Sequence, residues 1–201
     1  GVIPPEMMGK YLDIIVSETE RLNKLTKELL SLDNIDDRVR KMNYTSFNIN
    51  KLIKDTALSF EGICHEKGIS FMLLLEGDEL NVFADYGKIQ QVMYNLIDNA
   101  IKFSNANSSI HIETSLKKDK VYISVKDHGV GISNKDIAKI WQRFYKTDSS
   151  RGKDRTGTGL GLSIVKDIIS SHNQKITCIS TEGVGTEFYF TLDLAAVKPS
   201  P

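Results

Sequence analysis

Apolar residues recur at intervals of three and four from Met8 to Leu32, and Glu18 occupies the one position that breaks the series. This spacing predicts a long helix with a heptad-like stripe, as in the seam of a coiled coil or a four-helix bundle. A helix that lies on its own domain is the alternative interpretation. The residues that follow are polar and predict a hinge. We therefore expect a helical unit at 1–36, a linker at 37–43, a folded domain at 44–194 and a tail at 195–201.

After Tyr44 the chain alternates between strand and helix patterns. The patterns predict strands at 69–75, 81–84, 110–115, 121–126, 175–180 and 186–192, and helices at 48–67, 85–104, 133–141 and 160–171. Residues 145–158 are polar and predict a mobile loop. Because the strands form antiparallel pairs with helices between them, we expect an α+β two-layer sandwich rather than a wound sheet of βαβ units.

Capping residues set the ends of three expected helices. Asn48 begins a helix that continues to Gly68, and Asp85 begins the next one. The Ser-x-x-Asp pattern at 133–136 predicts a capping box for a short helix through Trp141. The first helix is expected to bury Ile49, Leu52, Ile53, Ala57, Phe60 and Ile63, and the second to bury Ile89, Val92, Met93, Leu96, Ile97, Ala100 and Ile101.

The composition excludes several classes of protein. Lys and Arg number 26 and Asp and Glu number 26, so bulk attraction to nucleic-acid phosphates is not expected. The longest apolar stretches are too short to span a bilayer, and no secretory segment opens the sequence. The two cysteines, Cys64 and Cys178, cannot form a disulfide framework, which indicates a reducing, cytosolic setting.

Helix 85–104 carries an unusual polar face. Asn95, Asn99 and Lys102 are spaced by four and three residues, so they share one side of the helix, away from the apolar stripe. An Asn carbonyl oxygen is a hard neutral ligand suited to Mg²⁺, and Lys suits phosphate. A solvated face is the alternative. Asp98 can pair with Lys102 and receives no chemical role.

Two glycine-rich turns are further candidates. Asp127 follows a strand and precedes Gly129 and Gly131, which allow a ligand to approach the backbone; the Asp can accept a hydrogen bond from an exocyclic amine such as that of adenine. An ordinary turn is the alternative. Residues 157–162 place alternating glycines before a helix N-terminus, where N–H groups can bind phosphate. A flexible hinge is the alternative there.

Cations follow the short helix. Arg143 lies between aromatic residues that can fix its direction, and Arg151, Lys153 and Arg155 come shortly after it. These side chains could close over a triphosphate. For the last three, a solvated charge run is the favoured alternative.

The order and spacing of these signals resemble the sequence boxes of sensor histidine kinases. Gln90–Ser104 is similar to the N box, Asp127–Ile132 to the G1 box, Trp141–Lys146 to the F box and Gly157–Leu162 to the G2 box. Residues 183–190 resemble the hairpin that closes that domain.

The resemblance covers residues 44–194 and implies the Bergerat ATP-binding fold, a mixed and mostly antiparallel sheet with helices on one face. Residues 6–36 are similar to the second helix of the hairpin that dimerises and carries the phosphoacceptor in this family.

The resemblance also implies roles for the matched residues. Asn99 would be the Mg²⁺ ligand, with Asn95 close to the metal and the phosphates. Lys102 would contact phosphate and Arg143 the γ-phosphate, so Asn95, Lys102 and Arg143 are the expected catalytic residues. Phe103 stands where the family usually has Tyr, flanking the nucleotide.

Asp127 would bind the adenine amine, and glycines on either side of the site would let the nucleotide approach. Gly157, Gly159 and Gly161 would form the phosphate-side end of the ATP lid. The expected nucleotide-binding set is completed by Gly129, Gly131, Ile132, Phe144, Thr158, Leu160 and Leu162.

The phosphoacceptor of this family is a histidine followed by an acidic residue on the first helix of the hairpin, and the sequence lacks that motif. His65 precedes Glu66, but it lies near the end of a helix in the ATP-binding domain and is interpreted as a structural or surface residue. His111 and His172 are expected to be incidental, and His128 to line the nucleotide pocket without a catalytic role.

These observations predict the ATP-binding catalytic domain of a two-component sensor histidine kinase, which transfers the γ-phosphoryl group of Mg²⁺-ATP to a histidine and then to an aspartate of a response regulator. The sequence is expected to begin after the helix that carries the histidine, so the chain should bind nucleotide without phosphorylating itself. An ATP hydrolase of the same superfold and a non-catalytic signalling scaffold are the alternatives; the hydrolases would place Glu where Asn95 stands.

The expected partners are ATP or ADP, the receiver domain of a response regulator and, in the full-length protein, a second copy of the chain. Neither nucleic acid nor direct membrane contact is expected for this chain. The expected location is cytoplasmic, whether or not the parent is anchored in a membrane.

Overall fold

The computed structural model describes residues 42–147 and 157–195, together with five separate helical positions nearer the N-terminus. The chain divides into two compact units, 1–41 and 42–201. Apart from those five positions, the helix predicted before residue 37 lies outside the described residues. So do residues 37–41 of the predicted linker, most of the predicted loop with Arg151, Lys153 and Arg155, and residues 196–201 of the predicted tail. Within the part of the chain that is described, no helix has the length and apolar character needed to cross a membrane.

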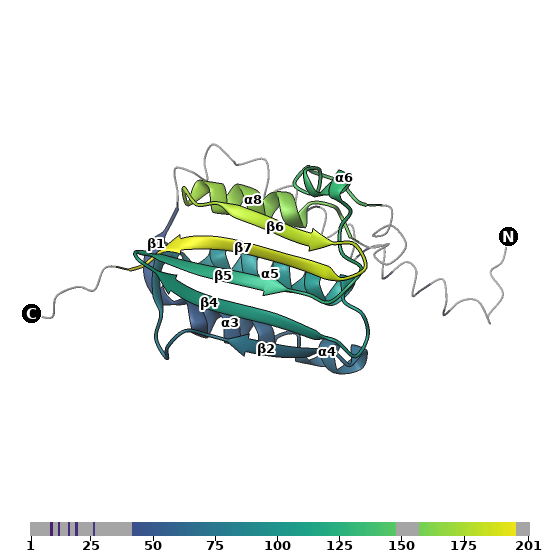
Figure 1. Cartoon of the computed structure of the whole chain (residues 1–201), viewed down its shortest axis with the longest axis horizontal. Coiled ribbons are helices and arrows are strands. Elements are labelled where there is room, and N and C mark those ends of the chain that lie inside the picture. Colours follow the sequence, from purple (N-terminus) through teal and green to yellow (C-terminus); the bar gives the residue numbers. More distant parts are fainter. Residues whose placement is uncertain are drawn as a thin grey trace, which may run out of the picture. The chain divides into compact units, whose positions relative to one another are not determined.

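The second unit alternates helices and strands much as predicted (Figure 1). The strands are β1 (Tyr44–Asn48), β2 (Ser70–Leu74), β3 (Asn81–Asp85), β4 (Ser109–Lys117), β5 (Lys120–Lys126), β6 (Ile176–Thr181) and β7 (Gly185–Asp193). The helices are α3 (Ile49–Leu58), α4 (Glu61–Lys67), α5 (Tyr86–Phe103), α6 (Asn134–Ile137) and α8 (Gly161–Ser171).

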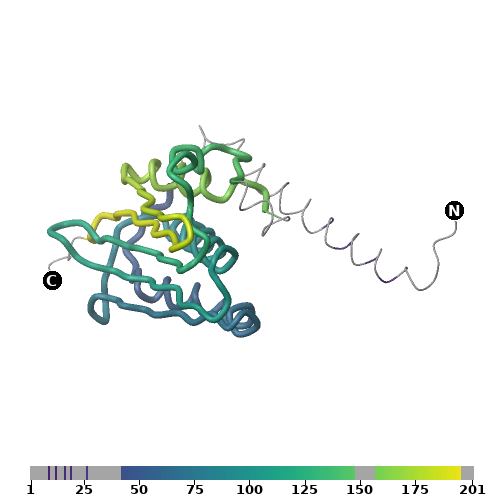
Figure 2. The backbone as a smooth tube through the Cα atoms, turned by 45° about the vertical axis from the view of Figure 1, so that its right-hand side comes forward, coloured from purple at the N-terminus to yellow at the C-terminus, as the bar shows by residue number. Residues whose placement is uncertain are grey.

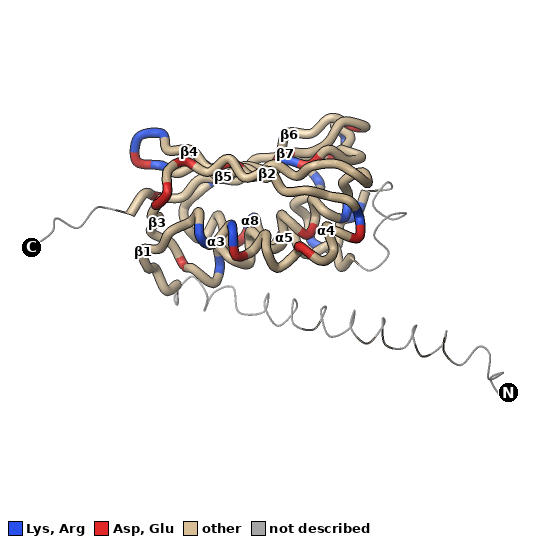
Figure 3. Tube along the Cα trace, turned by 90° about the horizontal axis from the view of Figure 1, so that it is seen from below, with Lys and Arg blue, Asp and Glu red and all other residues tan. Residues whose placement is uncertain are grey.

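Five strands form one sheet in the order β2-β4-β5-β7-β6, in which only the β2–β4 pair is parallel. Helices α3, α4, α5 and α8 lie on one side of this sheet, as Figure 3 shows from below. The predicted two-layer α+β sandwich, with a mixed and mostly antiparallel sheet, is therefore confirmed. Strands β1 and β3 pair antiparallel in a separate two-stranded sheet that the sequence did not predict.

The core lies between the sheet and the helices. On α5 the buried residues are the seven predicted from the helical period, and Asp85 caps the helix by accepting from Lys88 N at 3.1 Å. The β4–β5 hairpin alternates buried and more exposed positions, so Ile110, Ile112 and Ile123 point toward the helices. Hydrophobic periodicity was sufficient to predict the buried residues here, because the helix and the strands each bury one face.

The helix predicted from Asn48 to Gly68 is in fact two helices. Asn48 caps α3 and the left-handed Gly68 ends α4, as expected, but the chain turns at Phe60. The new helix axis keeps Phe60 in the core and leaves Ile63 48% exposed. A single helical period was therefore the wrong interpretation for this segment.

The predicted capping box before Trp141 is also wrong. Helix α6 ends at Ile137, and the Ser133 side chain makes no cap hydrogen bond to the backbone. Instead the Ser133 hydroxyl donates to Asp136 at 2.8 Å, and the Tyr145 hydroxyl donates to the same carboxylate at 2.7 Å. The Asp136 carboxylate thus connects Tyr145, after α6, to Ser133, at the start of α6. A four-residue sequence pattern does not reveal this connection.

His172, which was expected to be incidental, is a buried structural residue. Its Nε2 accepts from the backbone N–H of Asp85 at 3.1 Å, so Nδ1 carries the proton and donates to Ile168 O at 2.8 Å. Burial lowers the pKa of this imidazole. The neutral ring connects the end of α8 to the start of α5 and so fixes the two helices that flank the candidate site.

Candidate functional site

Helix α5 carries the polar face that the sequence singled out. Asn95, Asn99 and Lys102 are all half-buried. The Asn95 amide donates to Gln91 O at 3.0 Å, which turns its Oδ1 away from that carbonyl. Lys102 binds Asp98 at 2.8 Å, as predicted.

The first turn of α8 lies against this face. A Cβ added to Gly161 would be 3.2 Å from Asn95 Oδ1, so the backbone of α8 starts beside the amide. The N-cap residue Leu160 makes no side-chain cap hydrogen bond. The N–H groups of that turn and the positive end of the helix dipole therefore favour a negatively charged ligand between α8 and α5.

Asp127 follows β5 and is 5% exposed. Its backbone N–H donates to Thr186 O at 2.8 Å, and its Oδ1 accepts from Thr186 N at 3.3 Å. Burial raises the pKa of this carboxyl from 3.8 to about 6, against the smaller opposing effect of the N–H groups of Thr186 and Gly129. Since a carboxylate has acceptor capacity beyond these contacts, it is suited to bind an N–H donor on a ligand.

The turn after Asp127 needs its glycines. A Cβ on Gly129 would be 2.0 Å from the carbonyl oxygen of Phe103, the last residue of α5. Gly131 has a φ of +65°, and a Cβ there would be 2.1 Å from Thr181 O. Val130 N donates to Phe103 O at 3.2 Å, so the turn is closed directly onto the end of α5. The candidate carboxylate and the polar face of α5 thereby become neighbours.

The F-box and G2-like segments also meet. Phe144 N donates to Gly159 O at 2.9 Å, and the segment after α6 approaches the start of α8 in Figures 1 and 2. A Cβ on Gly159 would be 2.8 Å from the Phe144 carbonyl carbon. Leu160 is fully buried, and its N–H donates to Thr158 Oγ1 at 3.3 Å. Both segments are thus held at the same end of the unit.

Arg143 does not lie between aromatic rings as expected. Its guanidinium is 45% exposed and pairs with Asp167 of α8 at 3.4 Å. Phe144, the next residue, has a left-handed backbone with a φ of +63°, and its side chain is 60% exposed. The direction of Arg143 is therefore set by a carboxylate on α8.

His128 differs from the expectation too. Asp127 points into the unit, whereas the next side chain points to the opposite face, where His128 Nδ1 donates to Ser109 O at 2.9 Å. His128 lines a cavity on that outer face together with His111, which was expected to be incidental.

Comparison with known proteins assigns the family. Residues 84–196 match the profile of the histidine kinase-, DNA gyrase B- and HSP90-like ATPases, which is more than half of the chain. The chain belongs to this ATPase family. Membership implies that the domain binds ATP.

Relatives of this chain place its folded unit among the histidine kinases. It is 36% identical over 189 residues to the sensor histidine kinase WalK of Bacillus subtilis, covering 93% of this chain and 31% of WalK. It is 32% identical to the WalK of Staphylococcus aureus over 199 residues, covering 96% of this chain and 46% of that relative. The chain thus spans less than half the length of these curated relatives.

Among solved structures, the catalytic domain of histidine kinase ThkA has a TM-score of 0.68 and 34% identity, over 76% of this chain and 97% of that domain. A structure of ThkA in complex with response regulator protein TrrA has a TM-score of 0.78 and 31% identity, over 96% of this chain and 53% of that one. The folded unit of this chain is accordingly a histidine kinase catalytic, ATP-binding domain.

Two residues of the site received no role from the sequence. Thr186 donates its N–H to Asp127, and a Cβ on Gly185 would be 2.1 Å from Asp127 O. Both belong to the hairpin similar to the family's closing hairpin, which was the available signal. Their proximity to a residue almost 60 positions earlier follows from the β5–β7 pairing, which local patterns do not specify.

Proposed function

We propose that this chain supplies the ATP-binding catalytic domain of a two-component sensor histidine kinase, whose parent transfers the γ-phosphoryl group of Mg²⁺-ATP to a histidine and then to a response-regulator aspartate. The observation that carries the proposal is the buried Asp127 carboxylate in a glycine turn that closes onto the end of α5, the helix with the polar face. The family match and the kinase relatives support the same activity.

The base end of the site is assigned to Asp127. Its buried carboxylate accepts from the adenine amine, and the N–H of Thr186 holds it in place. Gly129 and Gly131 let the base and sugar approach the backbone. Phe103, Ile132 and Phe144 are assigned contacts with the nucleotide on the basis of the resemblance.

The phosphate end of the site is assigned to α5 and α8. Asn99 is the Mg²⁺ ligand, with Asn95 close to the metal. The described residues contain no cluster of three or more His, Cys, Asp or Glu side chains that could hold a metal, so the ion depends on the nucleotide phosphates for its remaining ligands. Bound Mg²⁺ would neutralise charge on the phosphates as the γ-phosphoryl group is transferred.

The chain's own cations complete this end. Lys102 contacts phosphate, and Arg143 meets the γ-phosphate after leaving Asp167, its partner at 3.4 Å. The phosphate-side end of the lid is formed by Gly157, Thr158, Gly159, Leu160, Gly161 and Leu162. These groups contribute to phosphoryl transfer by positioning the triphosphate and by stabilising its negative charge.

Titration of the chain with ADP and ATP, with and without Mg²⁺, tests the site. Asp127→Ala should weaken nucleotide binding roughly tenfold or more because it removes a hydrogen bond to a buried charged acceptor. Asn99→Ala should weaken binding in Mg²⁺ and leave binding without Mg²⁺ nearly unchanged. Gln90→Ala, an exposed position on the same helix, is the matched control and should bind as wild type does.

Two results would contradict these assignments. If the wild-type chain binds no nucleotide, the scaffold alternative replaces the kinase. If Asn99→Ala responds to Mg²⁺ as wild type does, Asn99 is not the metal ligand. In the full-length parent, acid-labile label from [γ-³²P]ATP should appear on a histidine and should be lost with Asn99→Ala.

The proposed protein partners are a response-regulator receiver domain and a second copy of the chain. The complex of ThkA with TrrA supports the first of these. Pairing through the helix predicted over residues 8–32 is proposed on its heptad-like stripe alone, and size determination by light scattering tests it.

A further inference from the structure

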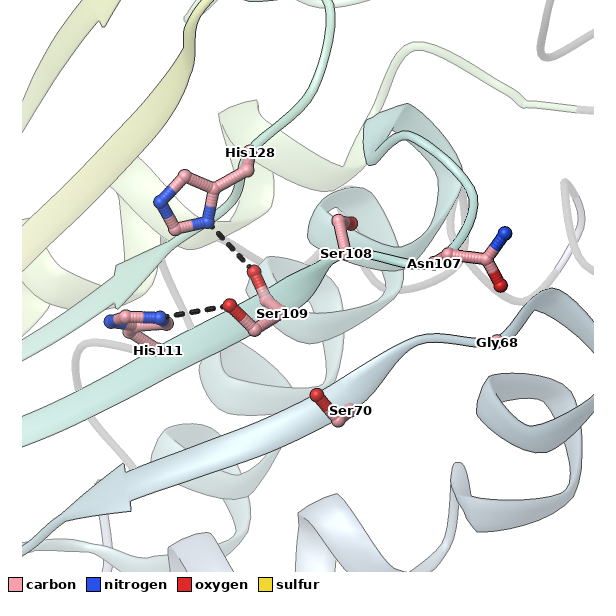
Figure 4. A pocket seen from close by; sticks show the side chains of 7 residues that line it. All are labelled: Gly68, Ser70, Asn107, Ser108, Ser109, His111 and His128. Carbon is pink, nitrogen blue, oxygen red and sulfur yellow. Dashed lines mark hydrogen bonds between the residues drawn. The ribbon is translucent and has the colours of Figure 1, made fainter.

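A polar cavity opens on the face of the sheet that the helices do not cover. Its volume is about 430 Å³, and it is lined by Gly68, Ser70, Asn107, Ser108, Ser109, His111 and His128 (Figure 4). None of these residues belongs to the nucleotide-binding set. The lining contains neither Lys nor Arg, so the cavity is not built to bind phosphate.

Two imidazoles lie next to each other in this cavity, in an edge-on arrangement. In the β4–β5 pair His111 lies opposite Lys126, and His128 comes two residues after Lys126, so the histidines are diagonal neighbours. Their ring centroids are 5.0 Å apart with an interplanar angle of 63°. Figure 4 shows that each ring directs one nitrogen toward Ser109 and the other away from it.

Ser109 orients both rings. Its carbonyl oxygen can only accept, so the 2.9 Å contact with His128 Nδ1 places the proton on Nδ1 and leaves the Nε2 lone pair unprotonated. Its hydroxyl contacts His111 Nε2 at 2.9 Å; in the tautomer in which that nitrogen donates the hydrogen bond to the hydroxyl, His111 Nδ1 keeps its lone pair. An imidazole that donates one N–H to a carbonyl or hydroxyl and keeps a lone pair on the other nitrogen has the form of a metal-ligating histidine.

We propose that His111 and His128 bind a divalent transition-metal ion of the zinc, nickel or copper class, through His111 Nδ1 and His128 Nε2. Imidazole nitrogens prefer these ions to Mg²⁺. Because the described residues contain no third His, Cys, Asp or Glu in the cluster, water and the Ser and Asn oxygens of the cavity complete the coordination. The site is therefore an exchangeable one, weaker than a closed structural zinc site.

The surrounding charges permit a cation. Lys126 is the nearest cation by register and lies opposite Glu187 on β7. Glu113 follows His111 by two residues and shares its face of β4. By strand register, the outer face near the pair thus carries Glu113 and Glu187 as well as Lys126.

Isothermal titration of the chain with ZnCl₂, without nucleotide and in a buffer that does not bind metals, tests the proposal. Wild type should bind a single ion, and His111→Gln should weaken that binding by about tenfold or more. His65→Gln, which changes an exposed histidine of α4 outside the cavity, should leave the affinity unchanged.

NMR of the imidazole nitrogens supplies a readout that does not depend on a variant. On zinc addition the resonances of His111 and His128 should shift together, while those of His65 and His172 stay in place. Equal zinc affinity of wild type and His111→Gln, or shifts confined to other histidines, would overturn the proposal. Since no nucleotide is present, this outcome is separate from the nucleotide titration.

Discussion

At the scale of single residues, the burial of Asp127 affects the stability of the domain and also underlies the role proposed for this carboxylate. The carboxyl is buried, and burial raises its pKa from 3.8 to about 6. The folded chain therefore holds this proton more tightly than the unfolded chain. The corresponding stability is fully present below pH 3.8 and is lost as the pH rises through about 6. At neutral pH the domain therefore keeps a destabilising charge at the position that we propose binds the adenine amine.

Asp127→Asn should therefore stabilise the nucleotide-free chain at neutral pH. Its advantage in the free energy of unfolding should grow between about pH 4 and pH 6, reach about 3 kcal/mol at most and stay constant above that. Urea unfolding at a series of pH values measures this.

The control for that experiment is Asp136→Asn. Hydrogen bonds from Tyr145 and Ser133 lower the pKa of the Asp136 carboxyl, so the folded chain binds that proton more weakly. The Asp136 variant should lose stability, relative to wild type, as the pH rises through the range where the unfolded carboxyl ionises. Responses of the same sign in both variants would contradict this account of Asp127.

At the scale of elements, the turn after β5 is shaped by what packs against it. It fits between the end of α5 and the β6–β7 hairpin, where Val130 O also accepts from Gly183 N at 2.8 Å. Backbone atoms of both neighbours occupy the space that side chains would need. The glycines here are a consequence of close packing between elements distant in the sequence.

Gly129→Ala should open this turn. The added methyl group would be 2.0 Å from Phe103 O, so either the turn or the end of α5 has to move. We expect a loss of about 2 kcal/mol or more in the free energy of unfolding and a clear loss of ADP affinity.

Gly62→Ala is the matched control, because a Cβ at this α4 position meets nothing within 4 Å. It should be neutral or stabilise the domain by up to about 1 kcal/mol, the usual difference in helix propensity. Thermal unfolding and ADP titration of the two variants provide the comparison. Similar effects of both substitutions would mean that the turn tolerates a side chain.

At the scale of the whole molecule, the two layers separate two kinds of site. The residues proposed to bind nucleotide lie on α5, in the turn after β5 and at the start of α8, and the histidine cavity opens on the uncovered face of the sheet. A general base in the proposed nucleotide site would favour transfer of the γ-phosphoryl group to water over transfer to a protein acceptor. Asn95 offers no base at neutral pH, which favours slow hydrolysis.

Asn95→Glu should raise ATP hydrolysis by about tenfold or more, since a positioned carboxylate can activate water. Asn95→Gln has the same side-chain length without a base and should show no increase. Phosphate release measures both. Brisk hydrolysis by the wild-type chain, or an equal rise in Asn95→Gln, would contradict the kinase assignment of this position.

The sequence was most informative where a pattern reports local physics. The stripe on α5, the caps Asn48 and Asp85 and the two hairpins follow from periodicity and backbone hydrogen bonding. It failed at Phe60, where burial in the core ends the first helix, and at Ser133, whose hydroxyl donates to the Asp136 side chain instead of capping the helix. The roles assigned to Asn99 and Asp127 in the site stay predictions until nucleotide binding is measured.

The sequence by itself determined the order of the elements, their buried faces and the set of polar residues available for chemistry, because each depends on side chains close together in the chain. Tertiary structure alone decided which residues far apart in the chain come into contact. Strand pairing places Thr186 next to Asp127, and the turn at Gly129 packs against the end of α5. Arg143 forms an ion pair with Asp167 and does not lie between aromatic rings. Such contacts join residues far apart in the sequence, so no local pattern encodes them.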